Sequence, residues 1–244
     1  MRAGLVGGGG RGGGARRAGT VGAVLGLAAL LAMAAPALHA QAPPGAGAEC
    51  RVVEDFAQTK VGEFPADWRV RKDAGKQVYS VQEEGGLRFL RAVSRGLGIQ
   101  AAREVKDWDL DAWPVLAWSW RPLEFPRGAD EKSGKNDSVL AVYLLVPYSR
   151  ITGPKAVKYI WSEKVPVGTR LESNYGLTQV RVLRSGREGL GQWVEERVNV
   201  RDDFLAFFGE KETPRPAGIA VLTDADDTRS VARGDYARFR ICKP

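Results

Sequence analysis

The chain has 244 residues, of which 44% are apolar, and its 36 basic and 29 acidic residues give a formal net charge of +7. This composition excludes an intrinsically disordered or collagen-like chain, because the apolar residues suffice for a sizeable core and the 30 Gly and 13 Pro follow no strict period. Two Cys are too few for a disulfide-dense scaffold.

The first 40 residues have the pattern of a secretory signal peptide. Four Arg and no acidic residue precede an apolar run over 21–31, and small residues then lead to Ala40. The run is shorter than the roughly 20 residues of a membrane span, so we predict no stable membrane insertion after cleavage. A flexible leader is predicted over 41–49. We therefore expect an exported protein, periplasmic or extracellular, with a single domain over 50–244.

Removal of residues 1–40 changes the charge and the available chemistry. The remaining chain has 32 basic and 29 acidic residues, a net charge of +3, which is not the electrostatic footprint of a nucleic-acid binder. The only histidine, His39, is also removed. Histidine-dependent hydrolysis and His-ligated metal sites are thereby excluded. Any catalysis would depend on carboxylates, Lys, Arg or Tyr.

Two cysteines stand near the two ends of the predicted domain, Cys50 and Cys242. In an exported protein this arrangement predicts a disulfide. A disulfide requires Cα atoms within about 7 Å, so the first and last strands should be neighbours. The alternative is a pair of unlinked, buried thiols.

Short apolar-rich runs alternate with turn clusters along the rest of the chain, which is typical of an all-β sandwich or barrel. Short loops between the runs favour antiparallel pairing, because parallel crossovers need a dozen residues or more. The predicted strands cover residues 51–56, 77–83, 87–93, 98–105, 115–123, 138–146, 156–161, 178–183, 192–200, 218–223 and 235–242.

Side-chain alternation indicates how two of these strands are covered. Residues 139–146 form a continuous apolar run, so both faces of that strand should be buried. In the last strand Tyr236, Arg238 and Arg240 alternate with apolar residues. This pattern predicts one wet face, which includes Tyr236, and one dry face.

One short helix is predicted before the last two strands. Phe204, Phe207 and Phe208 recur at helical spacing, and two acidic residues precede them where the helix dipole favours negative charge. Gly209 follows and can end the helix in the left-handed conformation. We expect about two turns that cover the core.

Several short segments together resemble a bacterial exported family known as domain of unknown function 3047. The matching segments include residues 118–120, 136–138, 159–161, 191–193, 203–209 and 218–228. The chain departs from the family at Asn136–Asp137, where an acidic pair is usual, and at Arg229, where a small residue is commoner. The resemblance implies export and an antiparallel β-sandwich of jelly-roll type similar to carbohydrate-binding modules. It brings no established activity.

Aromatic side chains are the first candidates for a ligand site. Two pairs, one on each of two predicted strands, have a spacing of two residues and therefore share a face. Such pairs either stack against sugar rings or fill the core between the sheets, the latter being the commoner arrangement. Four further tryptophans lie next to turn or charged residues and should be half exposed: Trp68, Trp108, Trp113 and Trp193. The candidate ligand-binding residues are Trp118, Trp120, Tyr159, Trp161 and Trp193.

The densest acidic cluster follows a predicted strand and consists of Asp224, Asp226 and Asp227. Asp224 and Asp226 project to one side of an extended segment and could offer two oxygen ligands to calcium, the one cofactor that the sequence suggests. Turn bonding that involves these carboxylates and Thr228 explains the cluster equally well. A catalytic role for the carboxylates is the third interpretation.

These observations predict an exported, non-catalytic module that binds an envelope or extracellular glycan. One alternative is a polysaccharide-active enzyme that uses carboxylates or Tyr without His. A second alternative is an envelope domain that binds another protein through an exposed apolar patch. The sequence assigns no catalytic residue and does not determine the oligomeric state.

Overall fold

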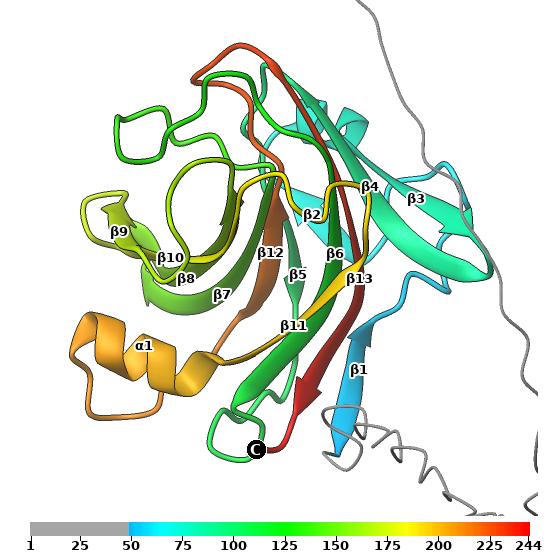
Figure 1. Cartoon of the computed structure of the whole chain (residues 1–244). Coiled ribbons are helices and arrows are strands. Elements are labelled where there is room, and N and C mark those ends of the chain that lie inside the picture. The colour runs from blue at the N-terminus through cyan, green and yellow to red at the C-terminus, as the bar shows by residue number, and fades with distance from the viewer. Residues whose placement is uncertain (1–48) are drawn as a thin grey trace, which may run out of the picture. The chain divides into compact units, whose positions relative to one another are not determined.

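The computed structural model describes residues 49–244, which form two β-sheets, one short α-helix and one 3₁₀ helix (Figure 1). The predicted signal peptide, with His39, and nearly all of the predicted leader lie outside the described residues, so these remain predictions. Within the described part of the chain, no helix is long and apolar enough to cross a membrane.

The strands pack as two facing layers. The first sheet, sheet A, has the order β11 (Val194–Asn199), β6 (Val115–Glu124), β13 (Val231–Cys242), β4 (Leu87–Arg95) and β3 (Tyr79–Glu84), with β1 (Cys50–Glu54) paired to β13. The second, sheet B, has the order β2 (Trp68–Val70), β5 (Ala101–Glu104), β12 (Gly218–Leu222), β7 (Leu140–Ser149), β8 (Gly153–Ser162), β10 (Thr178–Ser185) and β9 (Arg170–Ser173). The 3₁₀ helix η1 (Asp73–Gln77) lies between β2 and β3 in sequence. The predicted β-sandwich of jelly-roll type with one short helix is confirmed.

Each of the eleven predicted runs contains a strand, but β2 and β9 were not predicted. These strands have three and four residues, too few to show an alternating pattern. The expectation of antiparallel pairing is wrong for β8 and β10, which are parallel. The intervening β9 pairs with the far edge of β10, so the chain makes a crossover before it returns beside β8.

The main core lies between the two sheets and is rich in aromatic side chains. Trp118 of β6 packs against Tyr159 of β8 at 5.8 Å between ring centroids, and Trp120 packs against Trp161 at 5.9 Å. As predicted, β7 is buried on both faces. Its even-numbered residues from Leu140 to Leu144 join this core, while Ala141 and Tyr143 belong to a second cluster on the outer face of sheet B.

The alternation predicted for the last strand is wrong at Tyr236. A β-bulge between Ala237 and Arg240 shifts the register of β13, and Arg238 in it has a positive φ of 56°. Tyr236 therefore faces the core together with Phe239. Its hydroxyl donates to the carbonyl of Leu222 at 2.8 Å.

The predicted disulfide is confirmed and joins the two ends of the domain. Cys50 and Cys242 are directly paired residues of the antiparallel strands β1 and β13, with Cα atoms 4.1 Å apart. The first and last strands are thus neighbours, as the disulfide required.

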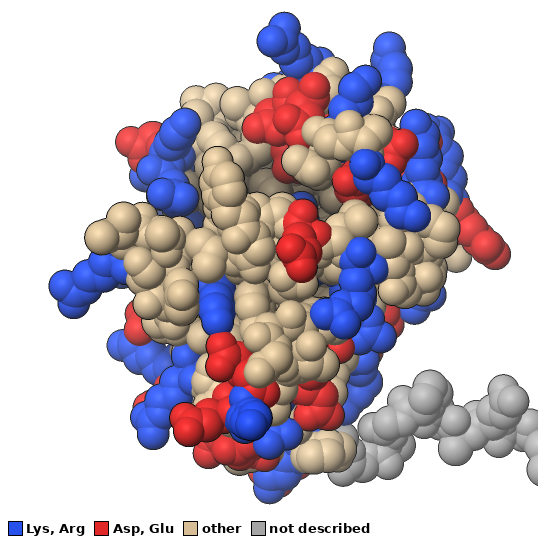
Figure 2. All heavy atoms as spheres, turned by 90° about the vertical axis from the view of Figure 1, so that its left-hand side faces the viewer, with Lys and Arg blue, Asp and Glu red and all other residues tan. Residues whose placement is uncertain are grey.

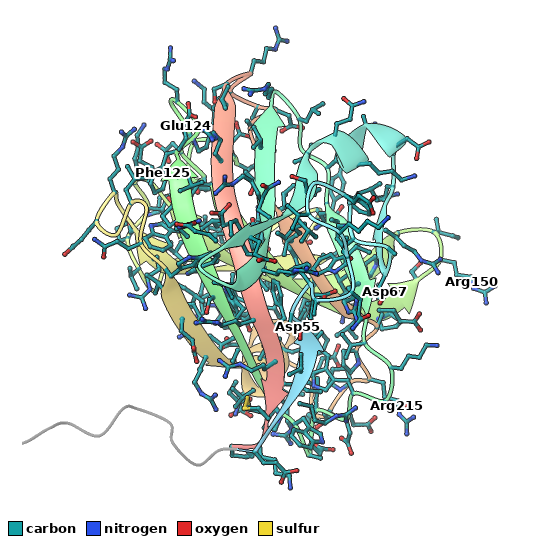
Figure 3. The ribbon with its side chains drawn as sticks, turned by 90° about the vertical axis from the view of Figure 1, so that its right-hand side faces the viewer. Asp55, Asp67, Glu124, Phe125, Arg150 and Arg215 are labelled. Carbon is teal, nitrogen blue, oxygen red and sulfur yellow. A yellow bond between two sulfur atoms is a disulfide. The ribbon has the colours of Figure 1, made fainter. Side chains whose placement is uncertain are left out.

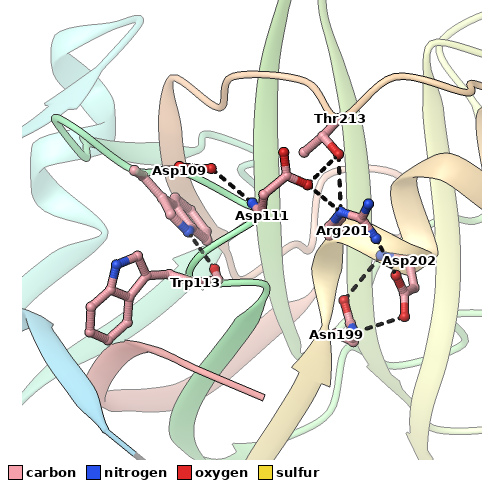
Figure 4. Close-up of polar contacts among 8 residues, drawn as sticks. Asp109, Asp111, Trp113, Asn199, Arg201, Asp202 and Thr213 are labelled. Atoms are coloured by element: carbon pink, nitrogen blue, oxygen red, sulfur yellow. Dashed lines mark hydrogen bonds and ion pairs between the residues drawn. The ribbon is translucent and has the colours of Figure 1, made fainter.

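The predicted helix is also confirmed as α1 (Val200–Phe208), which contacts β6 and β8 at one end of the sandwich (Figure 1). Asn199 caps its first turn by accepting a hydrogen bond from the backbone N–H of Asp202. Gly209 ends the helix in the left-handed region, with φ of 66°. The first turn of the helix is also linked to the loop that contains Asp111. Arg201 donates hydrogen bonds to Asp111 and Thr213 (Figure 4). The hydrogen bond that Asp111 accepts from Thr213 lowers the pKa of its carboxyl, and the bond from Arg201 adds to this decrease.

Candidate functional site

Three carboxylates meet where β12 ends. Asp224 and Asp226 follow this strand, and Asp137 comes from the segment before β7; one oxygen of each lies within 4.8 Å of the others. The predicted third member, Asp227, is not in this group. Its carboxylate instead accepts a hydrogen bond from the backbone N–H of Asn136 at 3.0 Å. Chain spacing could not reveal Asp137, because it is almost 90 residues from Asp224 and reaches it through tertiary structure.

Asp137 also holds the turn that follows Asp226. Its carboxylate accepts hydrogen bonds from the backbone N–H groups of Asp227 at 3.2 Å and Thr228 at 2.9 Å, and from the Thr228 hydroxyl. The turn-bonding interpretation is therefore correct for Asp137. Among the described residues, the backbone N–H groups give the Asp224 and Asp226 carboxylates one long bond, from Asp226 to Asp224 at 3.5 Å, and the two side chains also bond to each other.

Asp224 is the electrostatically unusual member of the cluster. Its pKa is raised to about 7, mainly by burial; Lys158 opposes this increase, and the neighbouring Asp226 and Asp137 add to it. Gly98 lies close to both neighbouring acids: a Cβ at this position would be 2.7 Å from an oxygen of Asp224 and 2.7 Å from one of Asp226. The carboxylate pair is thus packed directly against backbone, where any larger side chain would displace it.

A lysine and a tyrosine lie beside this cluster on the outer face of sheet B. Tyr143 of β7 and Lys158 of β8 are directly opposite each other in the antiparallel register, and Lys158 is only 7% exposed. Burial opposes the charge of Lys158, but Tyr143, Asp224 and Glu131 outweigh it, so its pKa is raised. For Tyr143, burial raises the pKa, and it outweighs Lys158 and a hydrogen bond with Gln100, which both lower it. At neutral pH both groups are protonated donors.

Small and larger apolar side chains flank this pair on the same face. Ala220 of β12 is directly opposite Tyr143 and Ala102 of β5 is opposite Ala220, while Val180 of β10 is opposite Lys158. A depression of about 470 Å³ lies beside them, lined by Arg71, Lys72, Gly98, Ile99, Gln100 and Leu222. Two residues of its lining contact the groups described above: Gln100 forms a hydrogen bond with Tyr143, and Gly98 lies against Asp224 and Asp226.

The side of the molecule that carries β8, β9 and β10 is shown in Figure 2. Uncharged side chains cover much of this view, which has a recess in its upper half; acidic side chains lie near its centre and above the recess, and many Lys and Arg lie toward its margins.

Four of the five predicted aromatic ligand residues are core residues. Trp118, Trp120 and Tyr159 have no exposed surface and Trp161 has 2%, because all four point between the two sheets. The sugar-stacking interpretation is therefore wrong for these four, and the core interpretation is correct. Trp193 is half-buried, as predicted, and lies on the outer face of sheet A, with Arg121 over its ring at 4.7 Å. Trp113 is also half-buried. The same prediction is wrong for Trp68, which packs against Phe56 and Phe239, and for Trp108, whose indole N–H donates to the carbonyl of Trp113; both are buried.

The sequence reasoning missed Tyr143, Lys158, Gln100 and Asp137. One signal was present: Lys158 is the only charged residue in an otherwise apolar and aromatic run, 156–161. A lysine retained at such a position is buried only if partners compensate it. Those partners, on β7 and after β12, could not be identified without the strand order.

Fold and site together define a β-sandwich protein with a lysine, a tyrosine and an acidic cluster on one outer sheet face. The chain belongs to the DUF3047 family, described as proteins of unknown function, whose model matches residues 66–240. No curated protein matches the sequence.

Several solved structures are similar in fold. The Family 11 carbohydrate-binding module of the cellulosomal cellulase Lic26A-Cel5E of Clostridium thermocellum has a TM-score of 0.39 and 7% identity, covering 80% of this chain and 95% of that module. CBM28, a carbohydrate-binding module specific for non-crystalline cellulose, has a TM-score of 0.40 and 12% identity, covering 78% and 94%. The family 11 xylanase from Neocallimastix patriciarum has a TM-score of 0.33 and 11% identity, covering 75% and 95%. Because these TM-scores are below 0.5, we assign no function from them.

Proposed function

We propose that this protein is an exported, non-catalytic module that binds a glycan on the outer face of sheet B. The observation that carries the proposal is the convergence of Tyr143, Lys158, Gln100 and Asp224 beside a depression whose lining includes Gln100 and Gly98. Few polar groups in a mostly apolar concavity are typical of small-ligand sites.

The protonation states of Tyr143 and Lys158 favour binding over catalysis. A general base must have a pKa near the working pH, whereas the pKa values of Tyr143 and Lys158 are both raised above already high normal values. These two groups act as fixed donors to sugar hydroxyl oxygens. Gln100 and Asp224 supply acceptors for sugar hydroxyl protons.

Substitution of the two donors tests the proposal. Lys158→Met and Tyr143→Phe remove a hydrogen-bonding group and keep most of the volume, so we expect glycan affinity to fall about tenfold or more, as for loss of a hydrogen bond to a charged group. Isothermal titration of the mature protein against a panel of soluble glycans measures this change. Lys164→Met and Tyr148→Phe, at exposed positions, are the matched controls and should bind as the native protein does.

Two outcomes would contradict the proposal: no glycan in the panel binds the native protein, or both variants bind with native affinity. A cooperative thermal unfolding transition of each variant serves as the control that the variant is folded. Gln100→Ala, at a half-buried position, provides a third variant should Lys158→Met fail to fold.

We also propose that Asp137, Asp224 and Asp226 hold a calcium ion beside this face. Calcium prefers six to eight oxygen ligands, to which three clustered carboxylates would contribute a part and backbone or water the rest. The weak internal bonding of Asp224 and Asp226 supports a role beyond turn bonding. A bound cation would relieve the repulsion among the three acids.

The pH dependence of stability with and without calcium tests this site. The pKa of Asp224 is about 7 in the folded protein against an ordinary value of 3.8, so the folded state binds its proton more tightly. Its contribution to stability is complete below about pH 4 and is lost as the pH rises through 7. In chelator, we therefore expect the Tm of the native protein to fall between pH 5 and pH 8 more steeply than that of Asp224→Asn.

Added calcium at pH 8 should raise the Tm of the native protein by several degrees and leave Asp224→Asn unchanged, since a ligand that binds only the folded state stabilises it. Differential scanning fluorimetry reports both changes. A Tm that is the same with calcium and with chelator would leave turn bonding as the sole role of the cluster.

One observation favours the enzyme alternative: the pKa of Asp224 is near neutrality and Asp226 lies next to it. This is the property expected of a carboxyl group in acid–base catalysis. The same glycan panel, assayed for new reducing ends, separates the two functions, because a binding module releases none.

A further inference from the structure

A second depression, of about 740 Å³, lies where β4 and β6 end and β13 begins. Its lining includes the segment 123–125 at the end of β6, of which Glu124 and Phe125 are labelled in Figure 3. The segment 228–231 forms another side. This segment follows directly after Asp226 and Asp227, so one loop contributes both to the acidic cluster and to the lining of this depression.

The lining is strongly basic. It includes Arg95, Arg127, Arg187 and Arg229 against a single acidic residue, Glu124. Arg187 is paired with Glu163 at 2.8 Å. Within residues 49–244, the guanidinium groups of the other three arginines form no ion pair or side-chain hydrogen bond with a carboxylate. Like charges gathered without counter-ions favour an anionic ligand.

The backbone that carries these arginines is fixed. The hydroxyl of Ser230 accepts a hydrogen bond from the N–H of Arg127 at 3.0 Å, and its carbonyl accepts one from Gly96 at 2.9 Å. These bonds hold three segments of the lining together. Arg229 itself has φ of 51°, a left-handed conformation that side-chain-bearing residues seldom adopt. Arg229 thus stands at a position that would suit glycine better.

The depression also has apolar and hydroxyl groups. The guanidinium of Arg187 lies 5.8 Å from the ring centroid of Phe125, and Leu190 is 44% exposed. Thr228 and Ser230 add hydroxyl groups to the lining. Guanidinium groups pair with carboxylate and sulfate oxygens, while apolar and hydroxyl groups suit the faces and edges of a sugar ring.

We propose that this depression binds an acidic sugar residue, so that the glycan recognised by the protein carries carboxylate or sulfate groups. The inference rests on the proposed function in taking the ligand to be a glycan, but it uses a different set of residues. A volume of about 740 Å³ is in the range of small-ligand pockets and suits a short acidic saccharide better than a macromolecular surface.

Variants of the unpaired arginines test the inference in the mature protein. Arg229→Gly removes a guanidinium and relieves the left-handed backbone, so loss of binding cannot be attributed to backbone strain. Arg95→Gln combined with Arg127→Gln removes two more positive charges. Arg150→Gln and Arg215→Gln are matched controls, because these exposed arginines lie on the opposite side of the molecule from Phe125 (Figure 3).

Isothermal titration with oligogalacturonate, sulfated dextran, neutral dextran and duplex DNA distinguishes the ligands. We expect oligogalacturonate or sulfated dextran to bind, with a loss of about tenfold or more in Arg229→Gly and in the double variant and native affinity in the two controls. Which of the two polymers binds more tightly identifies carboxylate or sulfate as the recognised group. Binding should weaken as salt is added.

The inference is overturned if acidic glycans bind the arginine variants with native affinity, if neither acidic polymer binds, or if DNA binds as tightly as the acidic glycans. Its failure is distinct from failure of the proposed function. A glycan of the panel that binds through Lys158 and Tyr143, with no dependence on the arginines, refutes only the acidic-sugar site. Absence of binding by any glycan refutes both.

Discussion

Removal of the Cys50–Cys242 disulfide is expected to lower the free energy of unfolding by about 5 kcal/mol, according to the loop-closure model for a long loop. The two cysteines are 192 residues apart in sequence, so the bond restricts almost the whole unfolded chain. For a domain of this size, the expected decrease in Tm is about 10 °C or more.

Loss of the disulfide has a second destabilising effect, because within residues 49–244 the only strand that β1 pairs with is β13. Glu54 at the end of β1 accepts hydrogen bonds from the indole N–H of Trp68 at 2.9 Å and from Arg103 at 2.6 Å. Release of β1 would therefore disturb the edge of sheet B as well. Without the disulfide, we expect β1 to be the first segment to exchange its amide protons.

Thermal unfolding with and without reductant measures this effect directly. The chain has two Cys, both in this bond, so a reductant has no other disulfide to cleave within the protein. Cys50→Ser combined with Cys242→Ser should reproduce the reduced state. An unchanged Tm in both experiments would show that the bond adds nothing to stability.

Asp235→Asn is expected to destabilise the protein by about 3–5 kcal/mol, as for breakage of a buried ion pair. Asp235 of β13 has no exposed surface, and Arg91 and Arg121 are its cross-strand neighbours on the two sides. Its carboxylate accepts two hydrogen bonds from Arg91, at 2.9 and 3.0 Å, and one from Arg121 at 2.9 Å. Loss of the negative charge removes the ion-pair partner of Arg91 and leaves Arg121 with the exposed Glu84 as its partner.

The ion pairs with Asp235 also raise the pKa values of both arginines. The hydrogen bond with Asp235 raises the pKa of Arg91. For Arg121, burial lowers the pKa, but the bonds with Glu84 and Asp235 outweigh it. Arg121 in turn lies over the Phe89 and Trp193 rings, so disorder of this arginine would spread to the aromatic side chains on the outer face of sheet A.

Glu84→Gln is the matched control for this prediction. Glu84 pairs with the same Arg121 at 2.8 Å, but its side chain is 64% exposed. Solvent screens such a pair, so its loss should change the Tm little. Urea unfolding of the two variants compares a buried with an exposed partner of one arginine. Equal stability of Asp235→Asn and the native protein would contradict the buried ion-pair account.

The sequence determined the local elements of this protein and the pairing of its ends. The continuous apolar run over 139–146, the caps around α1 and the two terminal cysteines each depend on residues that are close in sequence or on a single pair with one available partner. The side-chain periodicity of a strand or helix and the capping of a helix are set by backbone geometry over a few consecutive residues, so they can be read from the sequence. The all-β class follows from the same regularity.

Only the tertiary structure decided which side chains meet. The bulge at Arg238 turned Tyr236 into the core, and the strand order placed Lys158 beside Tyr143 and brought Asp137 to Asp224. It also gathered four arginines from separate segments around one depression. Each of these contacts depends on register and strand order over long separations, where a shift of one residue moves a side chain to the opposite face. Periodicity along the chain carries no information about such pairs.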